Sequence, residues 1–183
     1  MIKYLITDTK YYQNEKQFRQ TIQNSFKLHK PDIACFRDKS SNDFEKYAKI
    51  FYDISKKQNI NKIFINNNII LAKKYKYHGV HLNSNQFNDI KYAKKLGLKV
   101  AISCHSLKDV KVALRQKADI ATYSPIFKTP SKGQPQGLFA LKRATKIYDI
   151  PIIALGGIVS KRQIYKIKKI KLKGFASIRY FFK

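Results

Sequence analysis

The sequence predicts an α/β fold, a compact (β/α)8 TIM barrel, on three observations. Eight short apolar runs recur along the 183 residues, and most of the segments between them carry helical spacing. Strands that alternate with helices favour a parallel sheet, and eight such units favour a closed barrel over an open one. No glycine-rich fingerprint follows the first strand, where a dinucleotide-binding fold would place it.

The strands are predicted from short apolar segments of three to five residues. Val100, Ile102, Ile152 and Ile153 illustrate the β-branched residues that buried parallel strands favour. In chain order the predicted strands are Lys3–Ile6, Asp32–Phe36, Lys62–Ile65, Gly79–Leu82, Lys99–Ser103, Asp119–Tyr123, Pro151–Ala154 and Gly174–Ala176.

The helices are predicted from apolar residues that repeat on one face, as Phe44, Tyr47, Ala48 and Phe51 do. Ser41 or Asn42 can cap that helix, and Ser106 can cap a later one. The predicted helices are Glu15–Leu28, Asn42–Lys57, Gln86–Leu96, Leu107–Gln116, Gly137–Tyr148 and Ser160–Ile167.

The chain length suits one domain over residues 1–183, although it is short for this barrel class. We therefore expect a truncated C-terminal helix, a stub around Ile178–Phe182. One long irregular segment, Ser124–Gln136, is too polar and too rich in proline for a helix. Such a segment inside a compact domain indicates a functional loop.

The formal net charge of +27 is the most conspicuous bulk property. Clustered cations can bind nucleic acid, since they displace counterions from phosphates. Here lysine outnumbers arginine and is scattered along the whole chain, which favours compositional drift over specific nucleic-acid binding. No apolar run approaches the length of a membrane span or of a secretory core, so we expect a cytoplasmic protein with no membrane partner.

The cysteines and histidines suggest neither disulfides nor zinc. Cys35 and Cys104 lie far apart in the sequence and form no cluster with histidine at zinc spacing. Cys104 has no base placed beside it by the sequence, so we interpret it as a small buried residue.

Because chemistry in such barrels sits at the carboxyl ends of the strands, each strand end is a candidate site. After the second strand, alternation places Cys35, Arg37 and Lys39 on one side, which would form an anion site. A salt bridge to Asp38 is the alternative interpretation.

Three further strand ends carry polar side chains. The Asn66–Asn68 run suits a turn or helix cap and could also bind a heterocycle. We interpret His81 as a hydrogen-bonded core or rim histidine. His105 follows the fifth strand and is a candidate general acid–base, because the pKa of histidine normally lies near neutrality.

The last three strand ends predict a phosphate site. Thr129, Ser131 and Lys132 can surround phosphate oxygens, or can simply belong to a basic loop. Gly156 and Gly157 after strand seven, with the strand-eight end at Ser177, occupy the usual phosphate position of such barrels.

In this order these segments resemble the thiamine-phosphate synthase/TenI superfamily, from Tyr4 to Ala176. The most specific motifs are GVHL at Gly79–Leu82, SCHS at Ser103–Ser106, SPIFKTPSK at Ser124–Lys132 and ALGGI at Ala154–Ile158.

The resemblance implies binding of small phosphorylated thiazole or pyrimidine ligands. Of the Gln-x-Arg-x-Lys pattern at strand two, Arg37 and Lys39 remain, while Cys35 replaces the glutamine. Asn66 and Ser103 match substrate-binding positions, and the late phosphate-binding serine falls on Arg179. Thr129, Ser131, Lys132, Gly156 and Gly157 match phosphate-binding positions.

The family's two magnesium carboxylates are missing. Asn67 and Gln86 occupy their positions, and neutral amides cannot replace the anionic oxygens that magnesium prefers. TenI-like members also lack this pair, and they isomerise a thiazole carboxylate phosphate without metal. The resemblance therefore implies no metal and no cofactor, with His105 as the proton-transfer residue.

Three functions stay open at this point. The first is a metal-independent TenI-like thiazole tautomerase, an isomerase of thiamine biosynthesis. The second is a divergent thiamine-phosphate synthase, a transferase that joins pyrimidine diphosphate to thiazole phosphate and would need Mg²⁺. The third is a catalytically inactive barrel that binds phosphate ligands or RNA. Many family members associate, so a homo-oligomer is compatible with each.

Overall fold

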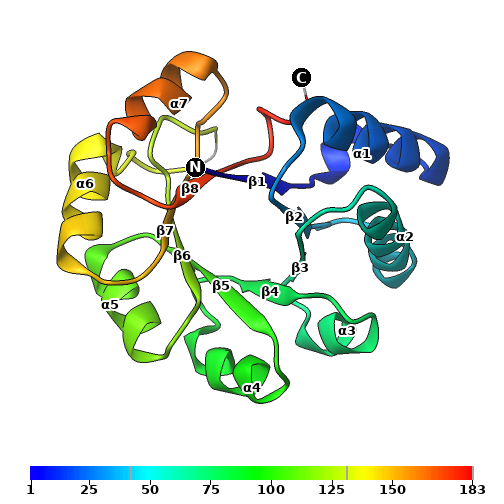
Figure 1. The fold of residues 1–183 in the computed structure, drawn as a ribbon, viewed down its shortest axis with the longest axis horizontal. Helices are drawn as coiled ribbons and strands as arrows, with labels where there is room; N and C mark the ends of the chain where they lie inside the picture. The colour runs from blue at the N-terminus through cyan, green and yellow to red at the C-terminus, as the bar shows by residue number, and fades with distance from the viewer. Residues whose placement is uncertain (42, 131, 183) are drawn as a thin grey trace.

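A computed structural model describes residues 1–41, 43–130 and 132–182. Eight parallel strands close into a barrel in sequence order, with β1 hydrogen-bonded to both β2 and β8. The helices surround the barrel on its outside (Figure 1). The predicted fold class is confirmed.

The strands begin and end within one residue of the predicted bounds. They are β1 (Ile2–Ile6), β2 (Ile33–Phe36), β3 (Lys62–Asn66), β4 (Gly79–Leu82), β5 (Lys99–Cys104), β6 (Ile120–Tyr123), β7 (Ile152–Leu155) and β8 (Gly174–Ser177).

Seven α-helices and two short 3₁₀ helices, η1 and η2, connect the strands in the described part of the chain. They are η1 (Thr9–Tyr11), α1 (Glu15–His29), α2 (Phe44–Lys57), α3 (Ile69–Lys74), η2 (Phe87–Asp89), α4 (Ile90–Lys95), α5 (Leu107–Arg115), α6 (Gly137–Ile147) and α7 (Lys161–Lys168).

Two elements, η1 and α3, were absent from the sequence prediction because neither is long enough to show a helical period. The Asn68 side chain caps α3 by accepting a hydrogen bond from the Leu71 amide, which is the cap function expected of the asparagine run. Ser106 caps α5 as predicted. Asp43, not Ser41, occupies the N-cap position of α2, without a capping hydrogen bond from its side chain, and Asn42 lies outside the described residues.

Two hydrophobic layers fill the molecule. The alternation of β2 sends Ala34 and Phe36 outward into the layer between sheet and helices, and Ile33 and Cys35 inward. The interior layer is built by residues from every strand except β4: Tyr4, Ile6, Ile33, Cys35, Phe64, Ala101, Ile120, Ile153 and Ala176. The barrel interior is therefore a packed core, and a ligand site of the barrel itself is expected at its mouth.

The chain after β8 forms a turn, so the expected stub around Ile178–Phe182 is not a helix. The Phe181 amide donates to the carbonyl of Ile178, and the Phe181 side chain is buried. Its ring stacks on Phe175 and meets the His29 ring edge-on. The buried Phe181 side chain fills the space beside the barrel in this turn.

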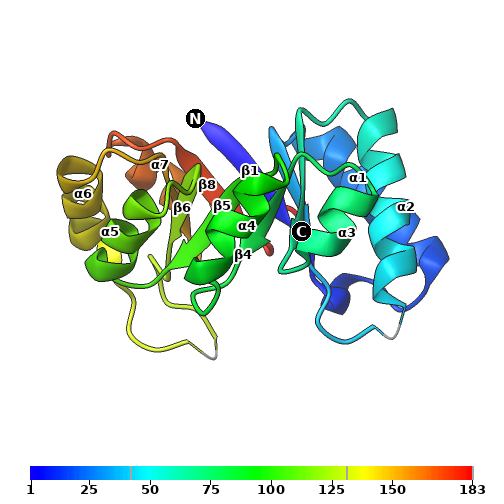
Figure 2. The same ribbon diagram turned by 90° about the horizontal axis from the view of Figure 1, so that it is seen from below.

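Long connections rise from one end of the barrel. The β2–α2 and β6–α6 segments both project from the end where the strands finish (Figure 2). This end is where the candidate site residues of the sequence are expected to meet.

Candidate active site

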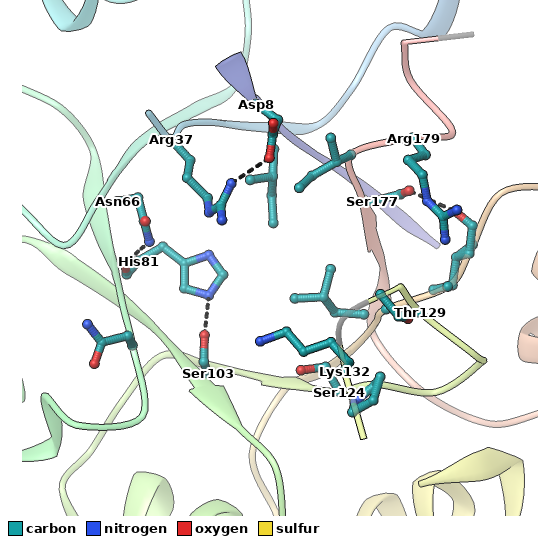
Figure 3. Close-up of a pocket in the computed structure, with 18 of the residues that line it drawn as sticks. Asp8, Arg37, Asn66, His81, Ser103, Ser124, Thr129, Lys132, Ser177 and Arg179 are labelled. Atoms are coloured by element: carbon teal, nitrogen blue, oxygen red, sulfur yellow. Dashed lines mark hydrogen bonds and ion pairs between the residues drawn. The ribbon is translucent and has the colours of Figure 1, made fainter. Parts of the chain in front are cut away.

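A cavity of about 520 Å³ opens at the carboxyl end of the barrel. Side chains or loops from all eight strand ends line it, and Figure 3 shows their convergence. Ser131 lies outside the described residues. All the other predicted site residues line the cavity: Arg37, Lys39, Asn66, Ser103, His105, Thr129, Lys132, Gly156, Gly157 and Ser177.

The cavity wall is strongly positive. One carboxylate, that of Asp8, is found among the described lining residues. The cationic lining residues are Lys10, Arg37, Lys39, Lys132 and Arg179. Such a concave, cationic surface concentrates anions and favours small phosphorylated or carboxylated ligands.

Arg37 is held in place at one side of the mouth. Its Nη1 lies 2.8 Å from Oδ2 of Asp8, and both side chains are about one-fifth exposed (Figure 3). Thr7 Oγ1 accepts from the Arg37 amide at 2.7 Å and donates to its carbonyl oxygen at 2.8 Å. Asp38, the partner considered from sequence, instead accepts hydrogen bonds from Tyr12, Ser40 and Ser41.

His105 is fixed at both its backbone and its ring. Its amide donates to Asp109 Oδ2 at 2.7 Å, which joins it to the start of α5. Its Nδ1 lies 3.0 Å from the carbonyl oxygen of Ser124. Since a carbonyl can only accept, we assign the proton of the neutral ring to Nδ1, which leaves Nε2 as the nitrogen that can take a proton.

His81 lies deeper, among polar groups inside the barrel. Its Nδ1 is 3.0 Å from the Tyr4 hydroxyl, and its Nε2 is 3.2 Å from Thr122 Oγ1 and 3.3 Å from Ser103 Oγ. Burial, together with the nearby charge of Arg37, lowers the pKa of His81 to about 4. His81 is therefore the hydrogen-bonded interior histidine expected from the alternation of β4.

The wall after β3 and β4 is built from neutral groups. Asn66 Nδ2 donates to the carbonyl oxygen of His81 at 2.8 Å and lies 3.3 Å from Asn67 Oδ1. Gln86 does not line the cavity, because its amide bonds to Asp89 and to the Asn83 backbone. The described residues hold no group of three histidine, cysteine or carboxylate side chains that could bind a metal. This donor set does not fit a magnesium ion, which needs carboxylate oxygens.

The β7 and β8 loops form the opposite wall. Gly156 and Gly157 have φ values of 92° and 71°, in the region that favours glycine. A side chain on Gly157 would begin 2.5 Å from the carbonyl oxygen of Phe127. The glycines are thus needed for close packing of the β7 loop against the β6 loop, a reason that the sequence did not reveal.

Some of the predicted hydroxyl ligands are already bonded within the protein. Thr129 Oγ1 donates to the carbonyl of Phe127 at 2.9 Å, and Ser177 Oγ donates to that of Ile158 at 2.7 Å. Near the start of α7, Ser160 Oγ accepts from the Gln163 amide, and Gln163 Oε1 accepts from the Val159 amide. A phosphate here would accordingly be met by the loop amides around Gly157 and by the side chains of Lys132 and Arg179.

Sequence reasoning missed several lining residues: Asp8, Lys10, Tyr11, Asn83 and Ser84. The rule that site residues follow the carboxyl ends of the strands, here called the strand-end rule, could have identified Asp8. Asp8 follows Ile6, the last residue of β1, by two residues. Lys10 and Tyr11 lie on η1, a helix too short to predict.

Both cysteines are unsuited to nucleophilic chemistry. Burial raises the pKa of Cys35 and of Cys104 to about 12, so each stays a thiol at neutral pH. Their buried positions agree with a packing role.

Comparisons with known proteins agree on one family. The family described as "Thiamine monophosphate synthase" matches residues 3–181. A protein of Aquifex aeolicus described as "Putative thiamine-phosphate synthase 2" is 35% identical over 161 residues, which cover 85% of this chain and 84% of that protein. The thiamine-phosphate synthase of Salmonella newport is 34% identical over 107 residues, 55% of this chain and 51% of that protein.

A solved structure supports the fold. The thiamine phosphate pyrophosphorylase of Pyrococcus furiosus superposes with a TM-score of 0.83 at 21% identity, over 97% of this chain and 85% of that one. In the described part of the chain, no helix has both the length and the apolar character that crossing a membrane requires.

Proposed function

This chain belongs to the thiamine monophosphate synthase family, and we propose that within it the protein is a metal-independent, TenI-like thiazole tautomerase. The substrate would be a thiazole carboxylate phosphate, and the reaction would move one ring proton. No metal and no other cofactor would take part.

The observation that carries the proposal is the composition of the β3–β4 wall. The family resemblance places the magnesium carboxylates of the synthases at two positions, and this chain has Asn67 and Gln86 there. Gln86 is turned away into a hydrogen bond with Asp89 at 3.1 Å. The cavity's carboxylate, Asp8, is paired with Arg37. A diphosphate leaving group would find cations here, but no carboxylate pair among the described lining residues that could hold magnesium.

His105 is the residue that we assign to proton transfer. Its Nδ1–H donates to the Ser124 carbonyl, so Nε2 can accept a proton from the substrate ring. The resulting imidazolium keeps its hydrogen bond to Ser124 and can return the proton to a second ring atom. A base fixed in this way needs no reorganisation during the step.

Two cationic regions would hold the two anionic groups of the substrate. Arg37 and Lys39 at the β2 end suit the carboxylate, and Arg37 is already oriented by Asp8. Lys132, Arg179 and the amides around Gly157 suit the phosphate at the opposite wall. This arrangement would place the ring between the two regions, beside His105.

The test of this assignment is turnover of the thiazole carboxylate phosphate by the wild type and by His105→Ala. We expect the variant to lose at least about 100-fold in kcat, the usual contribution of a positioned acid–base. His29→Gln, outside the lining of the cavity, is the control and should keep wild-type turnover. Equal activity of wild type and His105→Ala would refute the role of His105.

A divergent thiamine-phosphate synthase is the second candidate, because the relatives named above carry synthase names. Asn66, Lys39 and Lys132 would then bind the pyrimidine diphosphate. Formation of thiamine phosphate that stops when magnesium is removed would select this function over the tautomerase.

A further inference from the structure

A chain of hydrogen bonds runs from the barrel interior to the cavity wall. It links Tyr4 on β1, His81 on β4, Thr122 on β6 and Ser103 on β5. Tyr4, His81 and Thr122 are buried, and both His81 and Ser103 reach the lining of the cavity. The proposed proton transfer at His105 uses none of the three buried groups.

The single proton of the neutral His81 ring can be placed from its neighbours. The Thr122 hydroxyl donates to the backbone carbonyl of Ile102 at 3.3 Å, so toward His81 it presents a lone pair. The Nε2 that faces it, 3.2 Å away, must then carry the proton. The Tyr4 hydroxyl completes this arrangement by donating to Nδ1 at 3.0 Å.

The state of Ser103 follows from that of His81. Ser103 Oγ lies 3.3 Å from the protonated Nε2 of His81 and therefore accepts a hydrogen bond from it. The same N–H also faces Thr122. No acceptor for the Ser103 hydroxyl proton is found among the residues that the structure describes. Figure 3 shows the contact between Ser103 and His81 as a dashed line at the cavity wall.

We infer that His81 is a positioning residue, which holds Ser103 as a hydrogen-bond donor aimed at the ligand. A serine hydroxyl has one O–H and two lone pairs, and the buried N–H of His81 occupies one lone pair, which leaves the O–H free to donate. The wall then favours ligands with an acceptor atom at this point, a ring nitrogen or a carboxylate oxygen. The ligand's identity rests on the proposed function, but the protonation state of His81 does not.

The first test needs no ligand. Nitrogen-15 NMR of the labelled wild-type protein at pH 7 should show His81 as the neutral tautomer with its proton on Nε2. A proton on Nδ1, or a charged imidazolium, would overturn the inference whether or not the protein is a tautomerase.

The second test is a double-mutant cycle between His81→Phe and Ser103→Ala. Each single variant should weaken binding of the thiazole carboxylate phosphate about 3- to 10-fold, the value of one hydrogen bond. The double variant should be no weaker than Ser103→Ala alone. Losses that multiply would show that His81 acts independently of Ser103, and would overturn the inference.

Tyr4→Phe is the matched control. It breaks the same chain and leaves Nδ1 without a donor, but Thr122 still requires the proton on Nε2. We expect a less stable protein with unchanged ligand affinity. A loss of affinity as large as that of His81→Phe would indicate a merely structural role for the chain.

Discussion

At the scale of single residues, Gly157 combines two demands in one position. Its φ of 71° disfavours any side chain, and a Cβ would lie 2.5 Å from the Phe127 oxygen and 2.7 Å from that of Lys128. The cavity wall therefore depends on close packing between the β6 and β7 loops.

Gly157→Ala should lower the free energy of unfolding by about 2 to 5 kcal/mol, the combined cost of the left-handed backbone and of overpacking. Gly97→Ala is the control, because Gly97 has a similar φ of 79° but nothing within 4 Å of the added methyl. It should cost only about 1 kcal/mol. If urea denaturation gives the two variants equal losses in the free energy of unfolding, packing against Phe127 is unimportant.

His81 should make stability depend on pH in a defined window. The pKa of His81 is about 4 in the folded protein against an ordinary value of 6.5, so the unfolded chain binds its proton first as the pH falls. The stability contributed by neutral His81 is complete above pH 6.5 and is lost between pH 6.5 and 4. The ring faces Tyr4 on β1, Ser103 on β5 and Thr122 on β6, with Arg37 as the nearby charge.

Between pH 6.5 and pH 4, the free energy of unfolding should fall by up to about 3 kcal/mol because of His81. It is measured as the difference between wild type and His81→Gln in denaturation at several pH values, since all other groups are common to both. Parallel pH profiles for the two proteins would contradict the burial of His81.

At the scale of elements, the turn after β8 packs a buried aromatic side chain against the barrel and α1. Phe181 is 1% exposed and packs on Phe175 and His29, while Ser25 Oγ donates to its carbonyl oxygen at 2.7 Å. This turn ties α1 to β8 and closes the outer layer beside the barrel.

Phe181→Ala should therefore destabilise the protein by about 3 to 5 kcal/mol. Phe139→Ala removes the same group from α6 at a position that is 82% exposed, and should change stability by less than about 0.5 kcal/mol. Thermal unfolding of the two variants compares them directly. Similar midpoints would mean that the turn does not seal the core.

The elements were largely predictable because strands and long helices leave a period in the sequence. The strand-end rule then brought Arg37, Ser103 and His105 to one cavity without any structural information. The rule could not give side-chain pairing. Whether Arg37 meets Asp8 or Asp38 depends on the rotamer and on the loop path, which no periodicity encodes.

The sequence prediction missed the short elements for a related reason. The six residues of α3 span less than two helical turns, so their apolar positions fit a strand as well as a helix. The stub after β8 was wrongly expected as a helix, because the sequence does not show that Phe181 must turn inward to the core.

At the scale of the whole molecule, the charge of +27 should produce weak, non-specific attraction to polyanions. Labelled RNA should bind at low salt and be released near physiological salt, with no preference for sequence. Fluorescence titration at two salt concentrations with two unrelated RNAs measures this. Tight, sequence-dependent binding at physiological salt would contradict the compositional explanation of the charge.

The measurement that tests the central claim most directly is turnover of the purified protein on two substrate sets, each with magnesium and with EDTA. We expect isomerisation of the thiazole carboxylate phosphate at equal rates in both conditions, and no thiamine phosphate from the synthase substrates. Thiamine phosphate formed only with magnesium would contradict the account, and would show that Asn67 and Gln86 still support metal catalysis.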